Sequence, residues 1–307
     1  MAYQDIGFVC LDELLVRHAA DVALVVTHAD DPDEEIWFRS VADRARAARL
    51  PVLVPRSVND PAVVRLLAAV DPDFVFSFYF REMLTPGVLA LARRGALNLH
   101  GSFLPRYRGR SPVNWVLVNG ERETGVTLHY MDEKPDHGDV VAQRAVPIAD
   151  DDTALTLTRK MGEAARVLLR DALPALLAGA ASRTPQDHSR ASYFGGRRPA
   201  DGLIAWNRSA REIYNLVRAV THPFPGAFTD VGGRRLFVWW AEPKATERRG
   251  AAGEVLEVRP GEGVLVRAGE GALLLRDVEV DGDGEHRADR LAERLGLRPG
   301  DRLGAEG

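Results

Sequence analysis

Short β-prone runs alternate with helix-like segments over the first 150 residues of the chain. The β-prone runs cover residues 22–27, 51–54, 73–80 and 96–99, and apolar residues at helical spacing mark residues 36–50, 61–70 and 86–93. This alternation predicts a mainly parallel sheet with helices on both faces. Ligands of such sheets bind beyond the carboxyl ends of the strands, and residues 98–109 follow a strand at a position of that kind.

Two further strands are expected over residues 124–131 and 139–148, joined by a polar turn at residues 132–138. A long helix is then expected over residues 152–173, because apolar residues recur there at steps of three or four. Pro174 is expected to end or kink that helix, since proline lacks the backbone N–H and clashes with the preceding turn.

The second part of the chain has a different pattern. After a stretch rich in glycine, serine and arginine, the pattern predicts a helix at 210–220, strands at 235–240, 253–258 and 264–280, and a final helix at 287–295. Short strands separated by glycine-rich turns are typical of a small barrel or sandwich. The fold class is therefore α/β, a mainly parallel sheet with helices on both faces plus a smaller β-barrel-like domain. We expect a catalytic domain at residues 1–185, a linker at 186–200 and a small OB-like barrel at 201–307.

The start of the chain departs from this pattern. A sheet of this type normally opens on a full apolar strand, yet only Met1, Ala2 and Tyr3 precede the polar pair Gln4-Asp5. We therefore expect either a very short first strand or a natural start that lies upstream of Met1.

Composition and charge exclude several classes of protein. With 46% hydrophobic and 27% charged residues, the chain has the composition of an ordinary globular protein. Its net charge of -4 argues against a nucleic-acid-binding protein, because such proteins are usually basic. The chain has no apolar run of membrane-spanning length and no signal-peptide pattern, so we expect a cytoplasmic protein without membrane insertion. The lone cysteine, Cys10, is expected in the core, and no metal site is expected.

One loop carries residues that a plain turn does not need. Residues 98–110 read NLHGSFLPRYRGR, and Asn98 and His100 have the same parity on an extended segment, so their side chains point to the same side. An imidazole moves protons near neutral pH, and an amide N–H stabilises a developing oxyanion. The alternative is a loop histidine beside a turn-forming asparagine.

A carboxylate that partners the imidazole is expected in the turn DEKPDHGD. Asp136 is our candidate, because a carboxylate near an imidazole fixes its tautomer and favours its protonated form. Asp132, Glu133 and Asp139 are rivals in the same turn. The alternative is that all four carboxylates form a solvated turn.

The second half of the same loop contains three arginines, Arg106, Arg108 and Arg110. Next to a helix start, arginines suit an anionic ligand, and Arg110 is the best placed for that role. For Arg106 and Arg108 a solvated surface position is the simpler expectation. His129 is expected to be packed or to face water.

The residues Asn98, His100, the following Ser-Phe-Leu-Pro and Asp136 together resemble the signature of the folate-dependent formyltransferases. The family pattern has Ser-Leu-Leu-Pro at that point, so this sequence differs by one residue. Within the family the likeness is greatest to the enzymes that formylate UDP-4-amino-4-deoxy-L-arabinose. The matching segments are residues 76–84, 98–131, 193–206 and 217–228.

This resemblance implies transfer of a formyl group from N10-formyltetrahydrofolate to a sugar amine. It implies that Asn98 stabilises the oxyanion, that His100 handles the proton, and that Asp136 orients the ring. It also implies a cis peptide bond before Pro105. Folate is then expected against Glu82, Met83, Leu84, Arg110, Asp132, Glu133, Lys134, Pro135 and Asp136, and the nucleotide sugar against Tyr193, Arg197 and Arg198.

The acceptor implied by the resemblance is the 4-amine of UDP-4-amino-4-deoxy-L-arabinose, in lipid A modification and polymyxin resistance. Because the related enzymes are often fused to a decarboxylase, a separate chain is expected to supply that step. The alternatives are methionyl-tRNA formyltransferase and formylation of another nucleotide amino sugar. Residues 201–307 hold 16 Lys and Arg against 18 Asp and Glu, a net charge of -2, and this disfavours a tRNA partner. The oligomeric state stays open.

Overall fold

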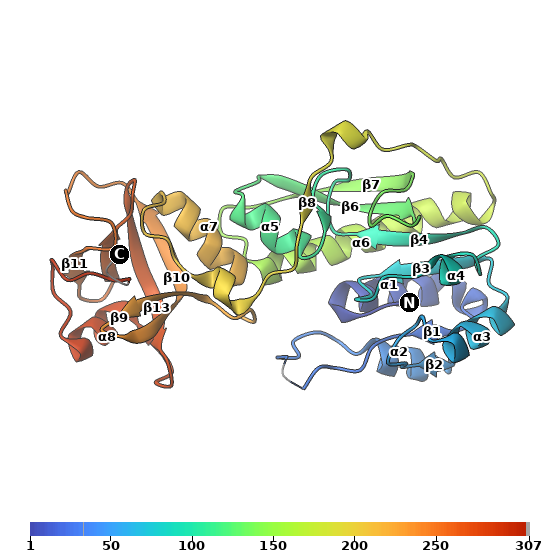
Figure 1. The fold of residues 1–307 in the computed structure, drawn as a ribbon, viewed down its shortest axis with the longest axis horizontal. Coiled ribbons are helices and arrows are strands. Elements are labelled where there is room, and N and C mark those ends of the chain that lie inside the picture. Colours follow the sequence, from blue (N-terminus) through green and yellow to red (C-terminus); the bar gives the residue numbers. More distant parts are fainter. Residues whose placement is uncertain (33, 305–307) are drawn as a thin grey trace. The chain divides into compact units, whose positions relative to one another are not determined.

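The structure is a computed structural model that describes residues 1–32 and 34–304 (Figure 1). The chain folds into two compact units, and each is described by itself. Unit 1 comprises Met1–Pro112, Arg122–Ile148 and Thr156–Gly195, and unit 2 comprises Val113–Glu121, Ala149–Leu155 and Gly196–Gly307. Unit 1 thus includes residues 186–195 of the predicted linker. The domain boundaries at residues 185 and 200 stay a prediction.

Unit 1 is built on a sheet flanked by helices, with parallel pairs among its first strands, as the alternating pattern predicts, and antiparallel pairs among its later strands. The parallel pairs are β1 with β2 and β3 with β4, and the antiparallel pairs are β4 with β6 and β6 with β7. The strands are β1 (Val25–Val26), β2 (Val52–Leu53), β3 (Phe74–Phe78), β4 (Gly95–His100), β6 (Glu123–Tyr130) and β7 (Val140–Pro147). The predicted α/β class is therefore confirmed.

The first three residues form the very short first strand that the sequence leaves room for. The N–H of Ala2 donates to the carbonyl of Val26 (3.0 Å), and the N–H of Phe78 donates to the carbonyl of Met1 (2.9 Å). Ala2 also forms a parallel bridge with Phe78. This segment therefore joins β1 to β3, and the two parallel pairs become parts of one continuous sheet.

The predicted helices of unit 1 are present in their central residues, and α3 has the predicted ends, whereas α2, α4 and α6 differ at their ends. Residues 4–18 form α1, for which we made no prediction, and Cys10 is fully buried in it, as expected. The expectation that the helix ends at Pro174 is wrong, because α6 continues to Leu177, and Leu173 and Leu176 remain buried on either side. A kink at Pro174 stays a prediction. One proline near the end of a helix removes a single backbone hydrogen bond, which the packing of these leucines offsets. The helices are α1 (Gln4–His18), α2 (Val41–Ala47), α3 (Pro61–Val70), α4 (Pro86–Leu89) and α6 (Ala154–Leu177).

Unit 2 combines an antiparallel sheet with three α-helices in the described part of the chain. The strands pair in the order β11-β12-β13-β10-β9, with β14 added beside β13, so the predicted smaller β domain is present. The helix α7 begins at a capping box in which Ser209 and Glu212 bond to each other's backbone N–H groups. The elements are α5 (Pro112–Val118), α7 (Ala210–Val220), β9 (Ala227–Val231), β10 (Arg234–Lys244), β11 (Val255–Arg259), β12 (Gly263–Arg267), β13 (Ala272–Val280), β14 (Glu285–Arg287) and α8 (Ala288–Leu295).

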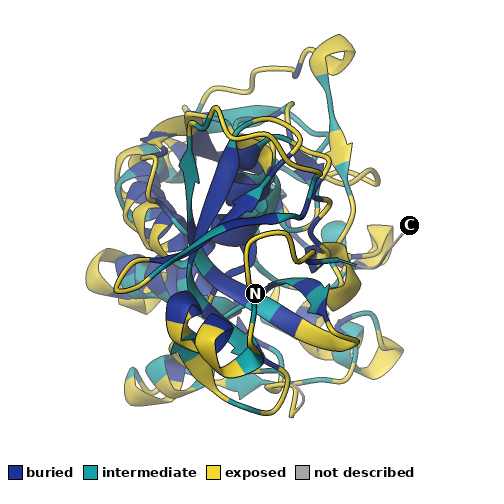
Figure 2. Cartoon of the chain, turned by 90° about the vertical axis from the view of Figure 1, so that its left-hand side faces the viewer, coloured by how far each residue is buried: buried dark blue, intermediate teal, exposed yellow. Residues whose placement is uncertain are grey.

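Burial is greatest in the sheets of both units, and most exposed residues lie in loops and on helices (Figure 2). Leu97, Leu99 and Leu128 are fully buried on β4 and β6, on either side of the residues that carry the candidate chemistry. Within the described residues, no helix has both the length and the apolar character that crossing a bilayer needs.

Leu97→Ala tests whether the β4 core determines the stability of unit 1. Removing this fully buried side chain is expected to lower the free energy of unfolding by about 2–5 kcal/mol, because a cavity remains in close-packed surroundings. Leu66→Ala is the control, since Leu66 is 54% exposed on α3 and its loss should change the free energy by less than about 0.5 kcal/mol. Urea unfolding followed by circular dichroism measures both, and equal effects would contradict the prediction.

Candidate active site

Asn98 and His100 lie at the carboxyl end of β4, as the strand pattern predicts. Leu99 between them points into the core, so the two polar side chains share the other face of the sheet. Across the antiparallel pair to β6, Asn98 lies opposite His129, and His100 lies opposite Thr127. The backbone register therefore places a second imidazole beside the amide of Asn98.

The carboxylate of Asp136 meets these side chains from the turn between β6 and β7. Its Oδ1 lies 3.3 Å from Nδ2 of Asn98, 3.4 Å from Nδ1 of His100 and 3.6 Å from Nε2 of His129. Its Oδ2 accepts a hydrogen bond from the backbone N–H of Gly109 (2.8 Å). The structure thus brings together the three residues that sequence analysis selected, although they lie up to 38 positions apart.

Burial alone would raise the pKa of Asp136, because only 10% of its side chain is exposed. The imidazoles of His100 and His129, each of which attracts the carboxylate while it carries a positive charge, and the N–H of Gly109 outweigh this and hold the pKa of the carboxyl well below its usual range. Asp136 is therefore ionised at neutral pH, and its negative charge is fixed against the two imidazoles.

The tautomer of His100 follows from its contacts. Its Nε2 lies 2.7 Å from the backbone carbonyl of Tyr107, and a carbonyl oxygen only accepts, so Nε2 carries a hydrogen. In the neutral ring Nδ1 is then the basic nitrogen, and it faces Asp136. This arrangement lets His100 take up a proton at Nδ1 while Asp136 stabilises the resulting charge.

His129 orients the amide of Asn98, a role that sequence analysis did not assign to it. Nδ1 of His129 donates to the carbonyl of Tyr130 (2.8 Å), so Nε2 of the neutral ring accepts from Nδ2 of Asn98 (3.2 Å). The amide N–H groups therefore face His129 and Asp136. His129 is packed, as expected, but the strand register that gives it this role is not visible in a periodic pattern.

The loop after β4 folds back over His100. The peptide bond between Leu104 and Pro105 is cis, as the resemblance implies. Thr127 holds the loop, since its hydroxyl donates to the carbonyl of Ser102 (2.6 Å) and accepts from the N–H of Leu104 (3.2 Å). These contacts fix the path by which the chain returns from the end of β4.

The loop then forms the short strand β5 (Arg108–Gly109), which pairs in parallel with β8 (Tyr193–Phe194). The expectation that Arg108 lies on a solvated surface is wrong, because its side chain is 1% exposed, whereas Arg106 is exposed as expected. Arg108 is buried because residues 186–193 cover it and provide its hydrogen-bond partners.

The residues expected to contact folate after β3 have different surroundings. The carboxylate of Glu82 accepts hydrogen bonds from Ser57 and Asn59, so it holds the loop after β2. Leu84 is buried in the core, while the side chain of Met83 is 59% exposed. Of these three, only Met83 presents its side chain to solvent.

The turn before Asp136 and the residue Arg110 are mainly exposed. The backbone N–H of Arg110 donates to the carbonyl of Phe194 (2.9 Å), and its side chain points to solvent. Asp132 accepts a hydrogen bond from Nδ1 of His137 (2.7 Å). The remaining expected folate contacts, Glu133, Lys134 and Pro135, are exposed.

The residues expected to bind the nucleotide sugar belong to two units. Tyr193, in unit 1, is 59% exposed, and its hydroxyl accepts from Nη1 of Arg108 (2.5 Å). Arg197, in unit 2, lies over the ring of Trp115 at 4.7 Å, and burial lowers the pKa of its guanidinium. Arg198 is exposed.

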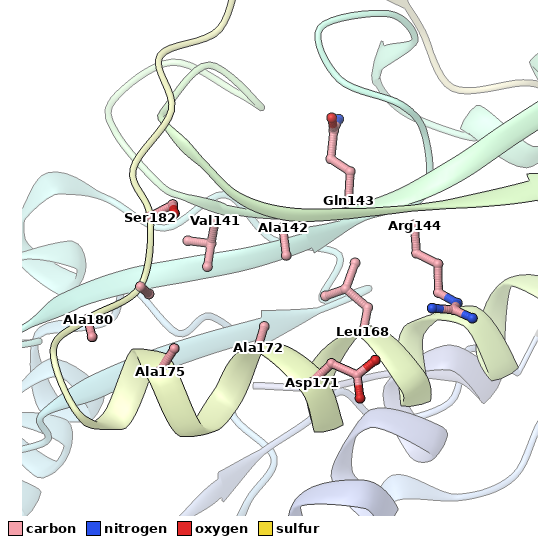
Figure 3. A pocket seen from close by; sticks show the side chains of 11 residues that line it. Val141, Ala142, Gln143, Arg144, Leu168, Asp171, Ala172, Ala175, Ala180 and Ser182 are labelled. Atoms are coloured by element: carbon pink, nitrogen blue, oxygen red, sulfur yellow. The ribbon is translucent and has the colours of Figure 1, made fainter.

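A pocket of about 290 Å³ opens elsewhere in unit 1, between β7 and the C-terminal half of α6 (Figure 3). Alanines line much of it, and Figure 3 shows the amide of Gln143 pointing away from α6. None of the three candidate catalytic residues lines this pocket, so it is separate from the candidate active site.

The low pKa of Asp136 predicts a pH-dependent contribution to stability. The ionised carboxylate stabilises the folded state fully above the ordinary pKa of 3.8, and the contribution is lost progressively as the pH falls below that value. Each unit of pKa depression is worth about 1.4 kcal/mol. The stability of the wild-type protein relative to Asp136→Asn should therefore decrease as the pH falls from 4 to 3. Thermal unfolding at each pH measures this, and a difference that is independent of pH would refute it.

Comparison with protein families gives two matches along the chain. The family described as Formyl transferase matches residues 9–173, and the family described as Formyl transferase, C-terminal domain, matches residues 197–295. The first match covers the candidate active site up to and beyond Asp136.

Solved structures share the fold at low sequence identity. WlaRD, a sugar 3N-formyl transferase determined with dTDP and 5-N-formyl-THF, is 19% identical with a TM-score of 0.68, over 92% of this chain and 96% of that chain. An N-formyltransferase from Helicobacter canadensis, in complex with folinic acid and dTDP-3-aminofucose, is 19% identical with a TM-score of 0.66, over 89% and 96%. HypX from Aquifex aeolicus, in complex with tetrahydrofolic acid, is 21% identical with a TM-score of 0.63. The match covers 92% of this chain and 50% of the HypX chain.

The family match accounts for more than half of the chain, and it covers the segment in which the amide, imidazole and carboxylate converge. The protein belongs to the formyl transferase family.

Proposed function

We propose that this protein transfers a formyl group from N10-formyltetrahydrofolate to the amine of a nucleotide-activated amino sugar. The observation that carries the proposal is the ionised, buried carboxylate of Asp136, which lies within 3.4 Å of both Asn98 and His100. Such a site combines a proton acceptor, a hydrogen-bonding amide and a fixed negative charge, and these are the groups that acyl transfer to an amine requires.

In the proposed reaction the neutral amine attacks the formyl carbon, and a carbon–nitrogen bond forms as the carbonyl becomes an alkoxide. The nitrogen is then positively charged, and Nδ1 of His100 accepts its proton, directly or through water. Collapse of the alkoxide breaks the bond to N10 of the folate, and N10 takes up the proton that His100 accepted, directly or through water, so that His100 returns to its starting form. The products are the formamide and tetrahydrofolate.

Asn98 and Asp136 support these steps in different ways. The amide of Asn98 is held between His129 and Asp136, and it hydrogen-bonds the reacting group as negative charge develops on oxygen. Stabilising that oxygen with Nδ2 requires the amide to exchange one of its two present partners. The charge of Asp136 stabilises His100 while the ring carries the extra proton.

The residues available around the site fit a folate cosubstrate. Asn98 and His100 provide polar contacts at the sheet edge, and Met83 and Arg110 provide exposed side chains on the segments after β3 and around β5. A guanidinium such as that of Arg110 suits the carboxylates of a folate. Three of the similar structures were determined with a bound folate, and this supports the same cosubstrate.

The acceptor class is supported by charge and by the related structures. A tRNA acceptor demands a basic surface, whereas residues 201–307 have a net charge of -2. WlaRD is a sugar 3N-formyl transferase, and the Helicobacter canadensis N-formyltransferase is in complex with dTDP-3-aminofucose. The sequence resemblance favours UDP-4-amino-4-deoxy-L-arabinose. We propose this sugar as the acceptor, with a place in lipid A modification and a cytoplasmic location.

Asn98→Ala, His100→Ala and Asp136→Ala are each expected to lower kcat by a factor of about 10²–10³, because each removes a group used in the transition state. Release of tetrahydrofolate in the presence of the amine measures the effect. The proposal fails if His100→Ala keeps more than about a tenth of the wild-type activity.

The surface pair His18 and Asp21 provides matched controls, because the same two residue types meet there at 3.3 Å on an exposed helix end. His18→Ala and Asp21→Ala should leave kcat within a factor of about two, as expected for a surface pair of little energetic weight.

The acceptor is tested with N10-formyltetrahydrofolate and a panel of UDP- and dTDP-linked amino sugars together with charged initiator tRNA. We expect the highest kcat/KM for UDP-4-amino-4-deoxy-L-arabinose and no salt-dependent binding of tRNA. A preference for another amino sugar would reassign the acceptor, tight salt-dependent tRNA binding would favour methionyl-tRNA formylation, and formate release without any amine would indicate a hydrolase.

A further inference from the structure

The segment before β8 reaches back to the candidate active site. Gln186 is 8% exposed, and its Nε2 donates to two backbone carbonyls, those of Asp136 (3.0 Å) and Gly138 (2.7 Å). The neighbouring Thr184 exchanges two backbone hydrogen bonds with Val140 at the start of β7 (2.8 and 2.9 Å). The side chain of Gln186 therefore links the backbone of Asp136 to that of Gly138 and holds the turn on both sides of His137.

Arg108 is the second part of this arrangement. Its Nη2 donates to Oε1 of Gln186 (2.6 Å) and lies 2.9 Å from Nδ1 of His188, and its Nη1 donates to the hydroxyl of Tyr193 (2.5 Å). These three partners are neutral acceptors, and Nε is buried without a hydrogen-bond partner among the residues that the structure describes. Because a buried cation with neutral partners is poorly compensated for its lost hydration, this arrangement is a weak source of stability.

The backbone on either side of Arg108 touches the catalytic residues. The carbonyl of Tyr107 accepts from Nε2 of His100, and the N–H of Gly109 donates to Asp136. Arg108 itself is tied to β8, since its N–H donates to the carbonyl of Ser192 (2.8 Å). Any movement of Arg108 therefore moves the groups that fix the tautomer of His100 and the position of the Asp136 carboxylate.

The backbone of Asp136 needs such support. Its φ of 54° lies in the left-handed region, which disfavours residues other than glycine. Three of the residues just before it, Glu133, Lys134 and Pro135, are exposed. The contacts that hold this conformation come from Gly109 on β5 and from Gln186.

We propose that Gln186 and Arg108 are positioning residues that hold Asp136 and His100 in their reactive arrangement. The inference rests on the proposed function, because it assumes that Asp136 and His100 carry the chemistry. Gln186 lies outside both matched family ranges, 9–173 and 197–295. The segment between these two matched ranges thereby contributes to the active site without touching the reacting atoms.

Gln186→Met tests the proposal, because methionine has a similar length and lacks the amide. We expect kcat to fall by a factor of about 10–100, because the loss of the amide displaces the catalytic groups by up to about an ångström. The KM values for folate and amine should stay within a factor of about two of the wild-type values. Gln186→Glu keeps an acceptor for Arg108 but loses both donors to the turn, so its kcat should fall to a similar degree. A kcat of at least half the wild-type value in Gln186→Met would overturn the proposal.

Asn215→Leu is the matched control for destabilisation. Asn215 is a buried amide in unit 2, 5% exposed, and its Oδ1 accepts from the buried Arg218 (3.0 Å). It should lower the melting temperature about as much as Gln186→Met while leaving kcat unchanged. If the two variants lose kcat to the same extent, the effect is general destabilisation and the positioning role is refuted.

A spectroscopic readout separates this inference from the proposed function. The imidazole resonances of His100, identified by their loss in His100→Ala, should shift in Gln186→Met and stay in place in Asn215→Leu. Unchanged His100 resonances in folded Gln186→Met would refute the positioning role even if no acceptor has been identified. An active His100→Ala would instead refute the proposed function.

Discussion

The burial of one carboxylate constrains the whole candidate active site. Asp136 is ionised with only 10% of its side chain exposed, so its oxygens need partners whose interactions compensate for the lost hydration. The partners are two imidazoles, an amide and a backbone N–H, and they come from β4, β6 and β5. Because four segments of the chain must meet at this charge, the site forms only when unit 1 is folded.

The sheet provides the part of this arrangement that is rigid. Paired residues on β4 and β6 set Asn98 against His129, and fully buried leucines on both strands keep the register from slipping. Groups that are fixed before substrate binds do not have to be reorganised during the reaction, and this is the main advantage of a site built on strands. The turn that carries Asp136 lacks this support and depends on neighbouring loops.

Both units contain a buried arginine whose hydrogen bonds go to neutral groups. Arg108 in unit 1 contacts side chains of the segment before and within β8, and Arg218 in unit 2 donates to the carbonyl of Ala149 (3.0 Å). The guanidinium suits this role because its planar fork reaches several acceptors at once. In unit 1 the segment that it anchors is also the one that touches the candidate catalytic residues.

The local pattern of the sequence determined most of the elements and the common orientation of Asn98 and His100. Residues 61–70 and 210–220 are helices with the predicted ends, and the parity of Asn98 and His100 holds on β4. These features depend on near neighbours in the chain, such as caps, proline at the first turn and the two-residue repeat of a strand. Asp136 was selected by chemistry and resemblance, and the structure places it against both partners.

The tertiary structure alone decided which polar residues are buried and what they contact. The local sequence around Arg108 predicts a surface position, yet Arg108 is buried because residues 186–193 cover it. Glu82 similarly forms hydrogen bonds to a neighbouring loop. The role of His129 depends on strand register, which a periodic pattern does not contain. Long-range pairing brings its contacts from residues distant in the chain, so the sequence determines the chemical groups and the fold determines their partners.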